Sequence, residues 1–356
     1  MLRLRVANEA AFITRQSTLL PCLAVLALAI PACAQGNLGP ITVGAGLRTS
    51  FVSTTPDGGP TTDQFQINDI RLYVSGPVYE DFKFMFNTDY NSVTNTVDVL
   101  DAVARLEVSP EFNVWFGRFL PPSDRADLYG PFYSHEWLPF SDGIQDGYPG
   151  IYQGRDNGVT YWGTFAKKIK VSLGAFDGKT ADNLNHLLGA ARVQIDFWDP
   201  EDGYYLNGTY YGDKNLLALG GATQWQDGHT AATADFLLEK KLHNGGAFSI
   251  ESEYSNYNQL GGYNPLYTHS QGAYGLASYL FPKKVGYGKF EVLGKFAKAD
   301  FTQGAKPSYN QKTGEFNFNY VMKQFNARAT LFYQRVVFNG QNPDFWEAGL
   351  GLQIQM

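Results

Sequence analysis

This chain has little cysteine, no concentrated positive charge and no long apolar run. Its 356 residues include two cysteines, and 28 Lys and Arg against 34 Asp and Glu leave a formal net charge of −6. Because there is no basic tract, the composition excludes nucleic-acid binding. The most apolar run, residues 19–30, is shorter than the roughly 20 residues that a transmembrane helix needs.

Motifs for catalysis and for metal binding are also missing. There is no G-x-S-x-G motif and no phosphate-binding glycine loop. The histidines lack the spacing of metal ligands; they are His135, His186, His229, His243 and His269. We therefore expect no cofactor, no metal site and no enzymatic activity.

Residues 1–34 have the pattern of a signal peptide. Three arginines precede the apolar run, and Ala32-Cys33-Ala34 follows it as a cleavage site. We expect cleavage before Gln35, which leaves residues 35–356 as one exported domain without disulfides or thiol chemistry. In an alternative interpretation Cys33 is a lipoprotein cysteine, but Pro31 stands where such signals prefer a small residue.

After the leader, apolar and polar side chains alternate with a period of two, which is typical of strands with one apolar face. In residues 80–91 one face carries Phe82, Phe84 and Phe86, and the other carries Lys83, Met85, Asn87 and Asp89. A soluble sandwich buries such apolar faces against each other. A membrane barrel turns them to lipid and lines its lumen with the polar faces.

Strand length and turn pattern favour the barrel. The strands have about 9–13 residues, as a tilted transmembrane strand requires, and short turns alternate with longer connections. The sequence therefore predicts an all-β, 16-stranded antiparallel transmembrane β-barrel with both termini on the periplasmic side. The predicted strands are 41–52, 64–76, 80–91, 97–108, 111–119, 156–166, 169–178, 187–198, 214–225, 229–241, 246–257, 271–281, 287–300, 314–323, 325–338 and 344–356.

Two other segments bear on this count. Residues 204–211 could form a strand, but one more strand would break the even number that bacterial barrels need, so we interpret 199–213 as a long periplasmic connection. The last strand has an apolar face that runs to Met356. Such a strand is the signal for the outer-membrane assembly machinery, although these proteins usually end on an aromatic residue.

Residues 120–155 are the longest segment in which we find neither strand nor helix. They contain five prolines and five glycines. Loops of this length are usually functional or disordered, and a disordered loop would be poor in the aromatic residues that are abundant here. We expect a folded loop that packs against another part of the protein.

Several segments resemble the phosphate-selective porin O/P family. They are I-R-L-Y-V-S-G-P-V-Y-E-D-F-K-F (70–84), F-N-V-W-F-G-R-F-L-P-P (112–122), G-R-D-N-G-V-T-Y-W-G (154–163) and L-L-A-L-G-G (216–221). The resemblance covers most of the exported chain. It implies a sixteen-stranded, usually trimeric outer-membrane porin whose loop after the fifth strand folds into the lumen. Residues 120–155 occupy the position of that constriction loop.

One departure from the family concerns the solute. Members that select phosphate line the constriction with arginines, two of which typically precede the R-L-Y-V-S-G segment. Here Asn68 and Asp69 stand there, and Arg71 remains. We therefore expect weak or absent phosphate selectivity. The resemblance implies a position on the lumen wall for Asn68 and Asp69. The strand alternation assigns six further residues to that wall: Arg71, Lys83, Arg105, Arg192, Lys295 and Arg328.

The loop should decide the charge preference of such a pore. Sixteen strands about 4.8 Å apart and tilted near 45° give a backbone radius of roughly 17 Å. Side chains would leave roughly 11 Å of open radius, beyond the ~8 Å Debye length at physiological salt. The predicted constriction residues on the loop are Asp124, Arg125, Asp127, Glu136, Trp137, Asp142 and Asp146. Most are acidic, which argues against a strong anion preference.

Two roles are open for the loop aromatics. They could form a sliding surface for sugars, or Trp137 and Phe140 could anchor the loop to the inner wall. We favour the anchor.

The sequence predicts a passive diffusion channel for small hydrophilic solutes or ions in the bacterial outer membrane. The expected partners are membrane lipid, the assembly machinery and two further copies in a homotrimer. A phosphate- or anion-selective channel is one alternative. Another is a non-conducting barrel that acts as a surface receptor or adhesin. A third is a barrel-embedded hydrolase, for which Ser134, His135 and Asp142 are the only candidate residues.

Overall fold

The computed structural model describes residues 40–92, 95–144, 154–178, 186–260, 269–302, 307–340 and 342–356. The predictions about the leader and about Asp146 concern residues outside these ranges.

The described residues form sixteen strands. They are β1 (Thr42–Pro56), β2 (Thr62–Tyr79), β3 (Phe82–Asn91), β4 (Thr96–Ser109), β5 (Phe112–Phe119), β6 (Asp156–Phe165), β7 (Ile169–Phe176), β8 (Leu188–Asp196), β9 (Leu216–Gln226), β10 (His229–Lys241), β11 (Ala247–Asn258), β12 (His269–Val285), β13 (Gly288–Thr302), β14 (Tyr309–Lys323), β15 (Ala327–Asn339) and β16 (Phe345–Gln355).

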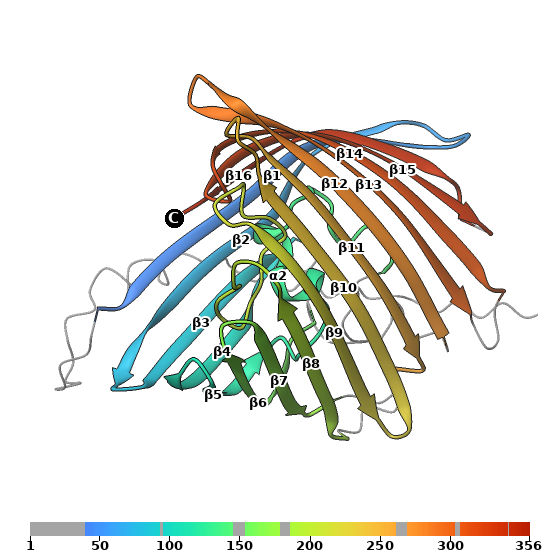
Figure 1. The fold of residues 1–356 in the computed structure, drawn as a ribbon. Helices are drawn as coiled ribbons and strands as arrows, with labels where there is room; N and C mark the ends of the chain where they lie inside the picture. The colour runs from blue at the N-terminus through green and yellow to red at the C-terminus, as the bar shows by residue number, and fades with distance from the viewer. Residues whose placement is uncertain are drawn as a thin grey trace, which may run out of the picture. The chain divides into compact units, whose positions relative to one another are not determined.

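The strands form one closed antiparallel barrel (Figure 1). Each strand pairs with its neighbours in sequence, and β1 closes the barrel against β16 with Gly46 opposite Gln355. The sixteen-stranded prediction is confirmed, and the sandwich is excluded because a sandwich has open edges. Among the described residues, no helix is long and apolar enough to cross a membrane.

The two faces of the wall differ as the alternation predicted. Large apolar side chains such as Phe116 and Leu331 point outward, with 66% and 56% of their surface exposed. The inward positions carry polar and charged side chains that are buried inside the barrel, including Arg192 and Glu251. The last strand follows the same rule, with Leu350, Leu352 and Ile354 exposed on its outer face.

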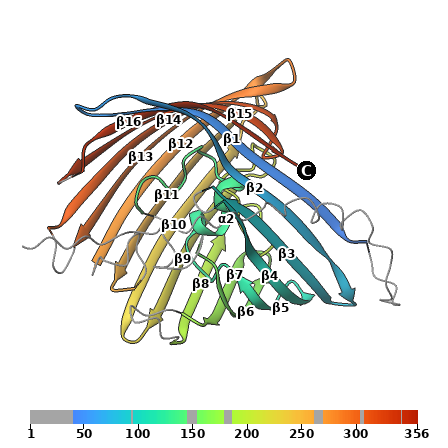
Figure 2. The same ribbon diagram turned by 180° about the vertical axis from the view of Figure 1, so that it is seen from behind.

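The segment after β5 lies inside the barrel and contains a helix, α2 (Arg125–Tyr133), which strands surround in both views (Figures 1 and 2). The expectation that 120–155 contains no helix was wrong. The Asp124 carboxylate accepts a hydrogen bond from the Asp127 backbone N–H at 2.8 Å and caps the helix N-terminus. A kink at Gly130, with φ of 61°, precedes Pro131. This irregular turn has no amphipathic period that would have predicted it.

The connection between β8 and β9 contains no strand, as we predicted. However, it does not stay at the rim of the barrel. Tyr204 and Leu206 are buried, and the Leu206 backbone N–H donates to the carbonyl oxygen of Leu128 in α2 at 3.2 Å. Two connections from opposite ends of the barrel therefore meet in its lumen.

Candidate functional site

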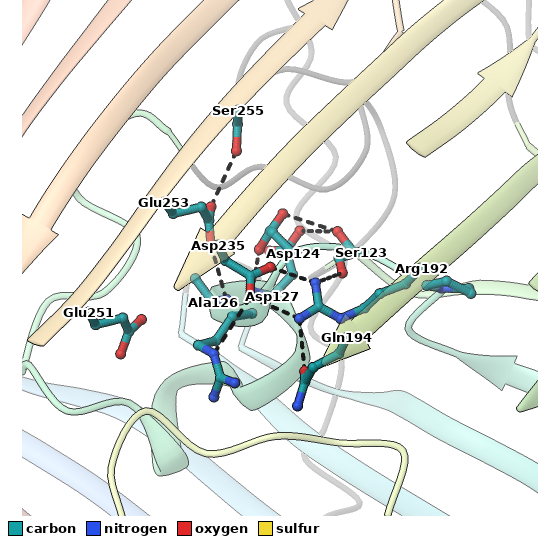
Figure 3. Close-up of polar contacts among 12 residues, drawn as sticks. Ser123, Asp124, Ala126, Asp127, Arg192, Gln194, Asp235, Glu251, Glu253 and Ser255 are labelled. Atoms are coloured by element: carbon teal, nitrogen blue, oxygen red, sulfur yellow. Dashed lines mark hydrogen bonds and ion pairs between the residues drawn. The ribbon is translucent and has the colours of Figure 1, made fainter. Parts of the chain in front are cut away.

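The base of the loop is held by a buried network of charges (Figure 3). Arg192 on β8 forms two hydrogen bonds with the Asp235 carboxylate on β10, at 2.5 and 2.9 Å. Arg192 also donates to the backbone carbonyl of Ser123 at 3.0 Å. Since Ser123 directly precedes the capping residue Asp124, the wall fixes the point where α2 begins.

The first residue of α2 makes a second buried ion pair. The Arg125 guanidinium contacts the Glu201 carboxylate through both of its terminal nitrogens, one of them at 3.0 Å. Burial alone would raise the pKa of Glu201, but the charge of Arg125 outweighs burial and lowers this pKa to about 2. Arg125 is therefore neutralised by a carboxylate from the opposite connection and does not face open solvent.

The tip of the loop, residues 134–142, is bound to strands β13 and β15 on the far wall. Lys295 on β13 contacts the carboxylates of Glu136 at 2.8 Å and Asp142 at 2.7 Å. Arg328 on β15 donates to the backbone carbonyls of Ser134, His135 and Glu136 at 2.9–3.3 Å. Arginine and lysine from the wall thus hold both the acidic side chains and the backbone of the tip.

Trp137 anchors the loop rather than offering a sliding surface. It is 1% exposed, and its ring stacks on Phe332 with centroids 6.0 Å apart. The Arg48 guanidinium lies 4.3 Å from the ring centroid. The wall residue beneath the ring is Gly351, where a Cβ would lie 2.4 Å from the Trp137 indole. This burial agrees with the anchoring interpretation for Trp137, whereas Phe140 is only half-buried.

The three candidate hydrolase residues do not form a catalytic unit. The His135 Nε2 atom contacts the Glu291 carboxylate at 2.9 Å. The Ser134 hydroxyl donates to the backbone carbonyls of Pro131 and Glu136, and Asp142 pairs with Lys295. A serine nucleophile requires a hydrogen bond to its base, and the structure directs these side chains to different partners.

Beside the loop lies a cavity of about 830 Å³. Its wall side is formed by β1 and β2, and its loop side by residues of α2 and the tip. The charged residues that border it are Arg48, Asp69, Asp127 and Arg155. The cavity is therefore lined by equal numbers of basic and acidic side chains.

A β-bulge in β2 lies at the edge of this cavity. Arg48 is opposite Asp69 in the register, but Thr49 is opposite Ile67, so Asn68 is the extra residue. Asn68 accepts a hydrogen bond from the Ser50 hydroxyl at 3.0 Å. Asn68 and Asp69 both border the cavity, as do the four residues before them on β2.

The arginines near the cavity are each matched by a carboxylate. Arg48 contacts Asp69 at 3.0 Å, and Arg71 contacts Asp89 at 3.0 Å and Asp69 at 4.0 Å. Arg155 lies 3.5 Å from Asp101. At such distances the field of each pair falls off much faster than that of a single charge.

The other predicted site residues lie as follows. Asp124, Glu136 and Asp142 are turned toward the wall or the helix and are buried, whereas Asp127 borders the cavity. Lys83 and Arg105 share Glu107, at 2.8 and 3.6 Å. The sequence reasoning missed Arg48 and Arg155. Arg48 was detectable because it follows Gly44 and Gly46 on the inward face of β1, whereas Arg155 lies outside any strand.

Within the ranges that the structure describes, no cluster of three or more histidine, cysteine, aspartate or glutamate residues could hold a metal ion.

A scan against known protein families finds no match, and a search among curated proteins finds no relative. Solved structures do share the fold. Pseudomonas putida OprB superposes with a TM-score of 0.63 at 9% identity, over 89% of this chain and 94% of that one. Salmonella typhi OmpF in complex with daunomycin gives 0.59 at 13% identity, over 89% and 97%. An anion-selective porin from Comamonas acidovorans gives 0.55 at 14% identity, over 89% and 99%. The chain has the fold of outer-membrane porins.

Proposed function

We propose that the protein is a passive diffusion channel for small hydrophilic solutes in the bacterial outer membrane. The observation that carries this proposal is the loop folded into a sixteen-stranded barrel beside an open cavity of about 830 Å³. A barrel of this size without an inner loop would be a wide, weakly discriminating pore. The loop reduces the passage to a space next to β1 and β2 that both polar and apolar side chains line.

Selectivity for phosphate is weak or absent in this proposal. The phosphate-selective porin O/P family remains the sequence resemblance that we propose for the chain, but its paired arginines are replaced by Asn68 and Asp69. The arginines that remain near the cavity contact carboxylates. An anion-selective channel is the second candidate, which the fold of the Comamonas porin supports. The matched charges favour the diffusion channel without phosphate selectivity over the anion-selective channel.

We further propose that residues 1–34 direct export, that β16 is the signal for the assembly machinery, and that the protein is a homotrimer. The wall from β5 to β8 supports the last point. These strands have 8–10 residues, and an 8-residue strand tilted near 45° covers only about 19 Å. The apolar band of such barrels is about 25 Å tall, so this wall is better covered by protein than by lipid.

The receptor, adhesin and hydrolase alternatives gain less support. A hydrolase would need another site, since Ser134, His135 and Asp142 are directed to separate partners. A plugged receptor would not need the cavity beside the loop.

Recording from the purified protein in a planar bilayer tests the proposed function. We expect stepwise increases in conductance, and swelling of vesicles in small neutral sugars. A folded protein that produces neither would refute the channel and favour a receptor or adhesin.

A further inference from the structure

The connection between β8 and β9 leaves the wall at a defined point. The strand ladder continues past the ends of both strands, since the Phe197 N–H donates to Leu217 at 2.8 Å and the Asp199 N–H donates to Asn215 at 3.0 Å. Residues 200–214 then enter the lumen. Within them Glu201, Tyr204, Leu206 and Thr209 are buried.

This segment binds the constriction loop from the opposite end of the barrel. The backbone N–H groups of Leu206 and Gly208 donate to the carbonyls of Leu128 and Tyr133, at 3.2 and 2.9 Å. These bonds hold the middle and the end of α2. At the start of the helix, Arg125 contacts Glu201 and donates to the Asn207 carbonyl at 3.0 Å.

The same segment is tied to the wall at two distant places. Glu239 on β10 accepts hydrogen bonds from the Thr209 hydroxyl and from the backbone N–H groups of Tyr210 and Gly212, at 2.6–2.8 Å. On β4, Asp101 accepts a hydrogen bond from the Tyr205 hydroxyl at 3.0 Å. The segment therefore crosses the lumen from β10 to β4 beneath the loop.

An apolar core fills the space between the segment, the loop and this part of the wall. Tyr204 packs against Trp115, with ring centroids 4.8 Å apart, and its hydroxyl donates to the Leu120 carbonyl at 2.8 Å. Leu128 from α2 and Leu206 belong to the same buried cluster. Close-packed apolar side chains exclude water, so a hydrophilic solute has no path through this part of the lumen.

We propose that residues 200–214 are a second pore-restricting element. From the periplasmic side they hold α2 in position and close the β4–β10 part of the lumen, so that solutes pass only beside β1 and β2. The size limit of the pore is then set jointly by two connections from opposite ends of the barrel. This inference rests on the proposed channel function.

Removing the segment without disturbing the wall tests the inference. Because the Asp199 N–H donates to Asn215 as in the last pair of a hairpin, Asn-Gly can replace residues 200–214 as a two-residue turn. We expect conductance to at least roughly double, and larger neutral polymers to enter the pore, because pore diameter limits passage. Heat-dependent gel mobility and the strand signal in circular dichroism report whether the barrel is folded.

A pair of point variants covers the case in which the deletion does not fold. Glu201→Gln removes the charge that Arg125 contacts, and Asp202→Asn removes one negative charge from an adjacent side chain that is 83% exposed. We expect Glu201→Gln alone to raise the conductance or the open-channel noise, and Asp202→Asn to leave both at the wild-type level.

The outcomes separate the two proposals. A wild-type protein that does not conduct refutes the channel function itself. A conducting wild type together with a folded deletion variant of unchanged conductance and size limit overturns the inference. If only the point variants fold, equal recordings from Glu201→Gln, Asp202→Asn and the wild type overturn it.

Discussion

At the scale of single residues, the site is organised by charge pairs. Arg48 and Arg71 both contact Asp69, and Arg71 also contacts Asp89. Alternation along a strand identifies the face on which each of these side chains lies, and so it predicted the lumen position of Arg71. It carries no information about the partner across the sheet, which depends on register and on the bulge at Asn68.

The first prediction concerns Asp69. In Asp69→Asn, Arg48 loses its carboxylate partner at the edge of the cavity, so one net positive charge appears there. A unit charge about 7 Å away in water changes the energy of an ion by about RT, so the anion-to-cation permeability ratio should rise by a factor of at least roughly three. Reversal potentials in a salt gradient measure the ratio.

Asp63→Asn is the matched control for this variant. Asp63 lies on the same strand but is exposed, and its removal should change the ratio far less. Equal shifts in the two variants would contradict the role of the Arg48–Asp69 pair.

The second prediction concerns pH. Burial by itself lowers the pKa of His135, but the negative charge of Glu291, with smaller contributions from Glu239 and Glu251, outweighs burial and raises it. A raised pKa in the folded state means that His135 stabilises the fold fully below its unfolded pKa of about 6.5. This stabilisation is lost as pH rises through the higher folded pKa.

Urea unfolding of the wild type and His135→Gln tests whether the stabilisation by His135 decreases as pH rises. The difference in unfolding free energy should be largest at acidic pH and should decrease as the solution becomes alkaline. His186→Gln, at an exposed histidine, should show a much smaller change. A His135→Gln difference that does not vary with pH would contradict the prediction.

At the scale of elements, the strands were predictable and the lumen segments were not. A strand in a barrel has one apolar and one polar face, so its period of two is visible in the local sequence. The helix α2 has no such signal, because Gly130 and Pro131 interrupt it. Its position depends on partners far away in the sequence, such as Glu201 and Arg192. The inward path of the β8–β9 connection likewise depends on partners far away in the sequence.

The third prediction concerns the anchor of the loop tip. Trp137→Ala removes a buried ring from between the tip and β15 and should lower the unfolding free energy by about 3–5 kcal/mol. Open-channel noise should rise because the tip is less firmly held. Phe140→Ala, at a half-buried neighbour, should cost much less, and equal losses in the two variants would show that Trp137 is not an anchor.

At the scale of the whole molecule, strand count and closure followed from counting periods and from the need for an even number. The unequal height of the wall was less evident from the sequence. In the structure β5 and β7 have 8 residues, whereas β12 has 17. In the proposed homotrimer, the copies contact one another through the side of the barrel that has the short strands β5 to β8.

The fourth prediction compares Leu173 on β7 with Leu331 on β15, which are 54% and 56% exposed on the outer face.

Leu173→Lys would place a charge inside the proposed contact between copies and should separate the oligomer. Leu331→Lys, on the proposed lipid-facing side, can extend its ammonium toward the headgroups and should leave the oligomer intact. Cross-linking in detergent measures both. Dissociation by Leu331→Lys alone, or by neither variant, would contradict the assignment of the short side.

The central claim is a narrow channel whose charges are internally matched. Its most direct test is the reversal potential of the wild-type protein in a potassium chloride gradient, followed by addition of phosphate. We predict a small reversal potential and no block of the chloride current at low phosphate concentration. A strong anion preference with phosphate block would contradict the account.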